Sequence, residues 1–197
     1  MREGPAVKKF MIRFNSPVIL SFALMSLLAL ALHVVTNGLT TQTFFSSYHS
    51  SLYDPMTYLR FVSHVLGCVS FDEYATLMLP QLLIGPPLEE KYSGVTLAVA
   101  IAMTALITGL VNFAVFRGNT LMGPNAVIFM LLVLTSFTDM KKEGIPLTMV
   151  LVVVFYLGRE IQAGMAVANH AHEFLNVVGG ICGVIFGFAL NGKKKGS

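Results

Sequence analysis

The sequence predicts an all-α polytopic membrane protein with six spanning helices and a structured first loop outside the membrane. Two observations predict this class. Of the 197 residues, 55% are hydrophobic and only 12% are charged, whereas a soluble domain is about a quarter charged. The apolar residues also gather into long segments, and a bilayer-crossing helix needs about 20 mostly apolar residues. The composition therefore argues against most soluble enzymes, nucleic-acid-binding proteins and disordered chains.

Six segments are predicted to span the membrane. In order they cover residues 17–35, 71–88, 94–116, 123–138, 145–157 and 175–190. The second is the weakest because polar residues and a proline interrupt it, namely Asp72, Glu73, Pro80 and Gln81. The fourth and fifth are short, which is typical of helices that neighbouring helices shield or that water enters.

The basic residues predict the orientation of the chain. Of the thirteen basic residues, ten lie before the first segment or just after the second, fourth and sixth segments. The other three lie in the remaining connections, namely Arg60, Arg117 and Arg159. The positive-inside rule then places both termini in the cytoplasm. We expect one multi-pass domain of the cell membrane over residues 1–197, with a cytoplasmic N-terminal segment at 1–16 and a basic cytoplasmic tail at 191–197.

The connection over residues 36–70 is predicted to be a structured first loop on the outer side. It is too long for a simple turn, and it is too rich in Phe, Tyr, Leu and Met for a free linker. Amphipathic aromatic side chains are stable at the membrane interface. We therefore expect folded structure that lies in or near the interface.

Polar groups at membrane depth are costly and usually serve a function. The candidates are His64, Asp72, Glu73, Asn112, Asn125, His172 and Asn176. His64 and Cys68 are four residues apart, but a metal site needs three or four convergent ligands. We therefore expect no metal, and we expect His64 to be hydrogen-bonded within the loop. Gly179, Gly183 and Gly187 are also four apart, which aligns them on one helix face and predicts close packing against another helix.

At several places the chain resembles the rhomboid family of intramembrane serine proteases. Tyr58-Leu59-Arg60, leading into His64, resembles the aromatic-x-Arg stretch of the family's first loop. Gly85-Pro86-Pro87-Leu88-Glu89 is similar to the Gly-x-x-Leu-Glu signature at the end of its second helix, and Gly179-x-x-x-Gly183 is similar to its sixth-helix glycine pattern. The resemblance covers nearly the whole chain. It implies a six-transmembrane-helix rhomboid-like bundle in which Arg60 and His64 are scaffold residues of the first loop.

The resemblance also implies four catalytic positions, and this chain departs from the family pattern at each. The family's Gly-x-Ser-Gly nucleophile falls on Asn125, and the histidine of its His-x-x-Gly-x-x-x-Gly motif falls on Asn176. The His and Asn that support the oxyanion fall on Glu73 and Leu77. An amide is neither an activated nucleophile nor a general base near neutral pH, and an ionised carboxylate would repel an oxyanion. The sequence therefore predicts a catalytically inactive member, a pseudoprotease.

Inactive members of the superfamily generally bind transmembrane segments of client membrane proteins. For this chain the resemblance therefore implies a client-binding cleft of polar side chains, comprising Glu73, Gln81, Asn125, His172 and Asn176. We expect Asn125 and Asn176 to hydrogen-bond to each other across this cleft. The expected partners are client transmembrane helices and the lipid bilayer, with no cofactor and no nucleic acid.

Two other functions remain open at the level of sequence. The chain would be an active intramembrane serine endopeptidase if the alignment were shifted, although Ser136, the one serine of the fourth segment, lies deep in it. The chain would be a small transporter if Glu73 served as its ionisable group. A transporter of this kind needs a continuous polar path, and the sequence shows no inverted repeat.

Overall fold

The computed structural model describes residues 16–137, 154, 158 and 170–192, and in this part of the chain every regular element is a helix. The elements are α1 (Pro17–Val35), α2 (Leu39–Phe44), α3 (Pro55–Ser63), the short 3-10 helix η1 (His64–Leu66), α4 (Phe71–Tyr92), α5 (Gly94–Val115), α6 (Asn125–Ser136) and α8 (Ala171–Gly192). The predicted all-α class is confirmed.

Among the described helices, α1, α5 and residues 171–190 of α8 are long and apolar enough to cross a membrane, and α6 is a shorter apolar helix. Each coincides with a predicted spanning segment. The fifth predicted segment, 145–157, lies outside the described residues. The number of six spans therefore stays a prediction.

Three helices differ by two residues or more from the predicted segments, and α8 is one of them, since it covers Ala171–Gly192 where 175–190 was predicted. The second predicted segment continues to Tyr92 as α4, although Pro80, Pro86 and Pro87 lie inside the helix and each removes a backbone donor. Membrane helices tolerate proline where neighbouring groups satisfy the freed carbonyls. The fourth segment begins as a helix only at Asn125, because Gly123 has a positive φ and Pro124 is the N-cap.

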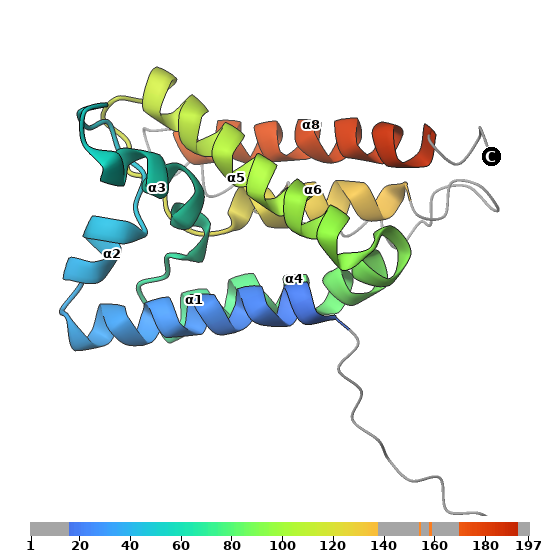
Figure 1. Ribbon diagram of the computed structural model, residues 1–197, viewed down its shortest axis with the longest axis horizontal. Helices are drawn as coiled ribbons and strands as arrows, with labels where there is room; N and C mark the ends of the chain where they lie inside the picture. The colour runs from blue at the N-terminus through green and yellow to red at the C-terminus, as the bar shows by residue number, and fades with distance from the viewer. Residues whose placement is uncertain (1–15, 138–153, 155–157, 159–169, 193–197) are drawn as a thin grey trace, which may run out of the picture.

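The helices form a bundle with the first loop at one end. Figure 1 shows α2 and α3 at the end of the bundle opposite to the end where α1 begins and α8 ends. Here α6 and α8 run side by side, and α5 crosses them obliquely. The predicted first loop thus contains α2, α3 and η1, and these short helices pack on α1 and α5.

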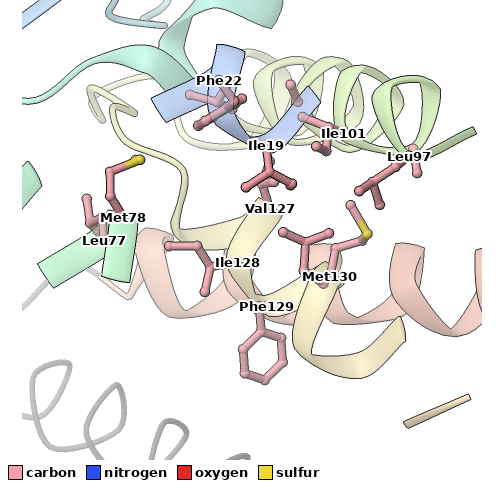
Figure 2. Packing of buried hydrophobic residues seen from close by; sticks show 14 of the residues in the cluster. Ile19, Phe22, Leu77, Met78, Leu97, Ile101, Val127, Ile128, Phe129 and Met130 are labelled. Carbon is pink, nitrogen blue, oxygen red and sulfur yellow. The ribbon is translucent and has the colours of Figure 1, made fainter. Parts of the chain in front are cut away.

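The hydrophobic core is centred on α6. Residues 126–132 of this helix are all buried, which is typical of a helix surrounded by other helices. Figure 2 shows Val127 beneath Ile19 of α1, and Ile128 on the side of Leu77 and Met78 of α4. Phe129 points in the opposite direction, and it packs on Gly180 of α8. Helix α6, which carries Asn125 at the predicted nucleophile position, therefore packs against other helices on several faces.

The glycine pattern of α8 lies against α6. A Cβ at Gly183 would lie 2.6 Å from the backbone oxygen of Met130, and a Cβ at Gly179 would collide with the backbone oxygen of Ala126. A Cβ at Gly187 would collide with the ring of Phe137. The missing side chains therefore allow the two helix backbones to approach each other closely, as small residues do in membrane helices.

The first turn of α1 is held by a carboxylate from α4. Glu89 is buried, and its two side-chain oxygens accept hydrogen bonds from the backbone N–H groups of Val18 at 2.9 Å and Ile19 at 3.1 Å. A helix leaves its first N–H groups without intrahelical partners, and its N-terminus favours negative charge. One turn away, Gly85 leaves room for the side chain of Ile19. The segment Gly85–Glu89 therefore fixes the start of α1.

Candidate functional site

The start of α6 is set by a left-handed turn at Gly123. Gly123 has φ +90°, a conformation that glycine adopts without steric cost. Its N–H donates to the backbone oxygen of His64 at 2.9 Å. A Cβ at Gly123 would lie 3.6 Å from both Nδ2 of Asn125 and Cδ1 of Leu77. The structure therefore brings together Asn125 and Leu77, two of the four positions that the sequence singled out.

The segment before Gly123 is tied to the first loop by backbone and amide hydrogen bonds. Ser47 and Leu121 form an antiparallel bridge, with N–H···O distances of 2.9 and 2.8 Å. The buried Nδ2 of Asn112 on α5 donates to the oxygen of Ser47 at 3.0 Å, and Asn119 donates to Oδ1 of Asn112 at 2.8 Å. The buried amide of Asn112 thus links α5 to the first loop and to the segment before Gly123.

Arg60 and His64 hold the first loop together from inside. The Nε of Arg60 donates to the oxygen of Thr43 at 2.7 Å, and its guanidinium lies 4.7 Å from the ring centre of Tyr48. It also forms an ion pair with Asp54 at 3.6 Å. The Nδ1 of His64 lies 3.2 Å from the oxygen of Arg60. Burial lowers the pKa of His64 to about 4, so its ring is neutral at pH 7.

Glu73 caps the first turn of α4. Its N–H donates to Oγ of Ser70 at 3.1 Å, and its carboxylate accepts from the N–H of Val69 at 2.9 Å. This arrangement is closely related to a capping box. The pattern Ser70-x-x-Glu73 is the sequence signal for this cap, which was not among the predicted features. Leu77, one turn further along α4, is buried.

Cys68 lies in the same part of the loop and is fully buried. Burial, followed by the negative charge of Glu73, raises the pKa of Cys68 to about 12. The thiol therefore stays protonated and is a poor metal ligand or nucleophile. In the part of the chain that the structure describes, no three His, Cys, Asp or Glu side chains are placed to hold a metal ion.

Asn176 lies on the face of α8 that packs against α6. Its side chain is buried, and it is one turn before Gly179, whose backbone contacts Ala126. Asn125 immediately precedes Ala126, so both predicted asparagines lie where α6 and α8 meet. His172 is one turn before Asn176 and is exposed.

Gln81 is the most unusual of the predicted cleft residues. It is only 1% exposed, and neither its amide oxygen nor its amide nitrogen has a hydrogen-bond partner among the described residues. It is on the interior face of α4, one turn beyond Leu77. A buried amide without partners costs about 1–3 kcal/mol. Sequence alone could place Gln81 at membrane depth, but it could not show that the side chain is enclosed.

The start of α6 carries the amide of Asn125 beside the apolar side chain of Leu77. Ser136, the serine considered for an active enzyme, lies at the opposite end of α6, about 16 Å along the helix axis.

The family comparison agrees with this architecture. The model of the Rhomboid domain matches residues 55–193. The chain belongs to the rhomboid family. Together with the apolar helices, this match makes it a rhomboid-family membrane protein. A comparison with curated proteins gave no match. The matched region includes the Gly123 turn, α4, α6 and α8, and therefore every position of the candidate site.

Proposed function

We propose that this rhomboid-family protein is proteolytically inactive and binds transmembrane helices of client membrane proteins. The observation that carries the proposal is the side chain at the start of α6. Asn125 follows the Gly123 turn and has Leu77 beside it. An amide supplies no activated nucleophile, and a leucine supplies no hydrogen bond to an oxyanion. The Gly123 turn of the scaffold is present, and the two described side chains beside it, Asn125 and Leu77, supply neither a nucleophile nor an oxyanion donor.

The same region supplies polar groups for helix recognition. Asn125 and Asn176 lie where α6 and α8 meet, and the Gln81 amide has no partner among the described residues. Hydrogen bonds between membrane helices contribute about 0.6 kcal/mol each. A client helix with a polar residue at mid-membrane gains such bonds. Because Gln81 is enclosed, it joins the contact only when α4 moves away from its neighbours.

Neither alternative function has a supporting observation in the described part of the chain. An endopeptidase would need a hydroxyl near a base, and Ser136 lies far from the Gly123 turn. A transporter would need Glu73 on a polar path, and one Glu73 oxygen is committed to the first turn of its own helix.

The first experiment tests for proteolysis. The purified chain is incubated with a transmembrane substrate beside two variants, Asn125→Ser with Asn176→His, and the same pair with Glu73→His and Leu77→Asn. We expect no cleavage by the unmodified chain, because it has no nucleophile at the start of α6. Cleavage by the unmodified chain that a serine-directed inhibitor blocks would overturn the inactive assignment.

The second experiment tests binding in lipid nanodiscs with two fluorescent peptide helices, one all-leucine and one with a central asparagine. We expect tighter binding of the asparagine peptide. Asn125→Leu with Asn176→Leu should remove two hydrogen bonds and weaken this binding about eightfold. Ser136→Ala, a change at the far end of α6, is the matched control. Equal binding of both peptides, or equal loss in the control, would contradict helix recognition at this site.

A further inference from the structure

Two buried polar side chains on α1 and α4 make no hydrogen bond within the described part of the chain. Gln81 of α4 is one of them, and the fully buried Ser26 of α1 is the other. Helix α1 is long and apolar enough to cross a membrane, and Ser26 is its central residue. At this depth there is no bulk water to pair with a polar group.

Ser26 lies on the face of α1 that contacts α4. A Cβ at Gly85 of α4 would collide with the side chain of Ile19. The backbone oxygen of Ala23 accepts a hydrogen bond from the hydroxyl of Tyr74, also on α4, at 3.0 Å. Ser26 is seven residues after Ile19 and three after Ala23, and these spacings return to the same face of a helix. Ser26 therefore faces α4.

Gln81 lies on the opposing face of α4, four residues before Gly85 and seven after Tyr74. The two helices are antiparallel, because the contacts move forward along α1 as they move backward along α4. Counted from the contact between Ile19 and Gly85, Ser26 lies about 10.5 Å along α1 and Gln81 lies about 6 Å along α4 in the same direction. The levels of the two residues therefore differ by about 4.5 Å.

The two side chains lean toward each other across this offset. The Cα–Cβ bond of a helical residue tilts toward the N-terminus of its helix, and the two N-termini are at opposite ends of the bundle. Ser26 and Gln81 nevertheless do not hydrogen-bond to each other. Two polar atoms that share one water molecule lie about 5 Å apart, and a buried water needs at least two polar partners. The amide and the hydroxyl supply them.

The hydroxyl of Ser26 also differs from other buried helix hydroxyls of the protein. Thr104 and Thr108 of α5 and Thr135 of α6 each donate to the carbonyl oxygen four residues earlier, at 2.8 Å. That bond satisfies a buried hydroxyl within its own helix. Ser26 does not make it, so its hydroxyl remains available to a group between α1 and α4.

We propose that Ser26 and Gln81 bind one water molecule between α1 and α4, near the middle of the membrane. The water accepts a hydrogen bond from the amide nitrogen of Gln81 and donates one to the hydroxyl oxygen of Ser26. It thus removes the cost of enclosing two polar groups without partners. It also links the two helices through a contact that a shift of either helix would break.

Radiolytic hydroxyl labelling of the purified chain in detergent, read by mass spectrometry, tests for this water. X-rays produce hydroxyl radicals from water in place, so a buried side chain is labelled when a bound water lies beside it. Met78 is the reporter, because it is buried on α4 one turn from Gln81. Met130 of α6 is the internal control, because it is also buried and Figure 2 shows it on the side of Leu97, away from Met78. We expect labelling of Met78 and none of Met130.

The Met78 label should fall to the level of Met130 in Gln81→Leu and in Ser26→Ala, since each variant removes one partner of the water. Ser21→Ala is the matched control, because Ser21 is an exposed serine of the same helix, and it should keep the label. Ser26→Ala removes only one oxygen atom, so it keeps the test available if Gln81→Leu does not fold.

Thermal unfolding of the same variants gives a second measurement, which does not depend on Met78. Either substitution releases the water, so the shift in melting temperature of Ser26→Ala with Gln81→Leu should be smaller than the sum of the two single shifts. The shifts of Ser21→Ala and Gln81→Leu should add.

Three results would overturn the proposal. Equal labelling of Met78 and Met130 would show that no water lies beside Met78, and non-additive shifts in that case would mean that Ser26 and Gln81 bond each other directly. A Met78 label that persists in both variants would place the water elsewhere. Additive shifts of Ser26→Ala and Gln81→Leu would show that the two side chains share no ligand.

Discussion

At the scale of single residues, two buried polar residues, Glu89 and His64, connect elements that are far apart in the sequence. Glu89 bonds the first turn of α1 from the far end of α4. His64 bonds Arg60 through its ring, while its backbone oxygen holds Gly123. Both are buried, and the loss of the Glu89 side chain leaves two backbone N–H groups without their acceptor in a place that water does not reach. Their substitution tests how the scaffold is held.

We predict that Glu89→Ala lowers the stability of the protein by about 3 kcal/mol, since hydrogen bonds to a charged group contribute about 1.5–3 kcal/mol and two N–H groups would lose their acceptor. Glu90→Gln is the matched control, because Glu90 is the adjacent carboxylate and is exposed. Thermal unfolding in detergent measures both. A melting temperature of Glu89→Ala equal to that of Glu90→Gln would refute the role of Glu89.

We predict that His64 makes the protein less stable in mild acid. Burial lowers its pKa from the ordinary 6.5 to about 4, so between these values the unfolded chain binds a proton that the folded chain does not. Stability therefore falls as the pH decreases through this window, by about 3 kcal/mol in all, and is fully present above about pH 6.5. Unfolding measured from pH 7 to pH 4 should show this loss, and His64→Gln should remove it. A loss of equal size in His64→Gln and in the control His33→Gln would assign the pH dependence to other groups.

At the scale of elements, the contact between α6 and α8 decides the geometry of the candidate site. The two helices approach so closely that the position of Asn176 relative to Asn125 depends on Gly179 and Gly183. The backbone oxygens of Ala126 and Met130 occupy the space that side chains would need. Backbone cannot be displaced as easily as the end of a side chain, so even one methyl group should separate the helices.

We predict that Gly179→Ala destabilises the protein by about 1–3 kcal/mol, the usual cost of overpacking. Gly118→Ala is the control, because a Cβ at Gly118 meets nothing within 4 Å. Cysteine crosslinking between the starts of α6 and α8, together with thermal unfolding, gives the measurement. Unchanged crosslinking and unfolding in Gly179→Ala would show that the helices do not pack through this glycine.

At the scale of the whole molecule, the positions of the basic residues predict the orientation in the membrane. Figure 1 places the first loop and the start of α1 at opposite ends of the bundle. The positive-inside rule puts the end with the start of α1 in the cytoplasm. Tyr53 of the first loop is 99% exposed, and Ser93 is exposed at the other end. These two positions are therefore suitable reporters.

We predict that a membrane-impermeant maleimide labels Tyr53→Cys in intact cells, whereas it labels Ser93→Cys only after the membrane is opened. The two native cysteines, Cys68 and Cys182, are buried and should give little background. The unsubstituted chain provides the measure of that background. The reverse pattern of labelling would invert the proposed orientation.

The helical class and the helix positions could be predicted because they depend on local apolar runs. Residues 17–35 were predicted as a segment and form α1 with the same bounds. The end of α4 was missed, because the charged residues Glu89, Glu90 and Lys91 end the apolar run at Leu88 although the helix continues to Tyr92. The start of α6 was missed by two residues, since a hydropathy pattern does not reveal the positive φ of Gly123.

The sequence by itself determined the membrane class, the family resemblance and the chemical identity of the candidate site, because all three depend on which residues occupy which positions. Only the tertiary structure decided that Gln81 is enclosed with no hydrogen-bond partner among the described residues, that Glu73 caps its own helix and that Glu89 holds α1. These outcomes depend on which distant groups share a space that water does not reach. In that space a polar group is stabilised by its neighbours alone, and one sequence does not show which neighbours they are.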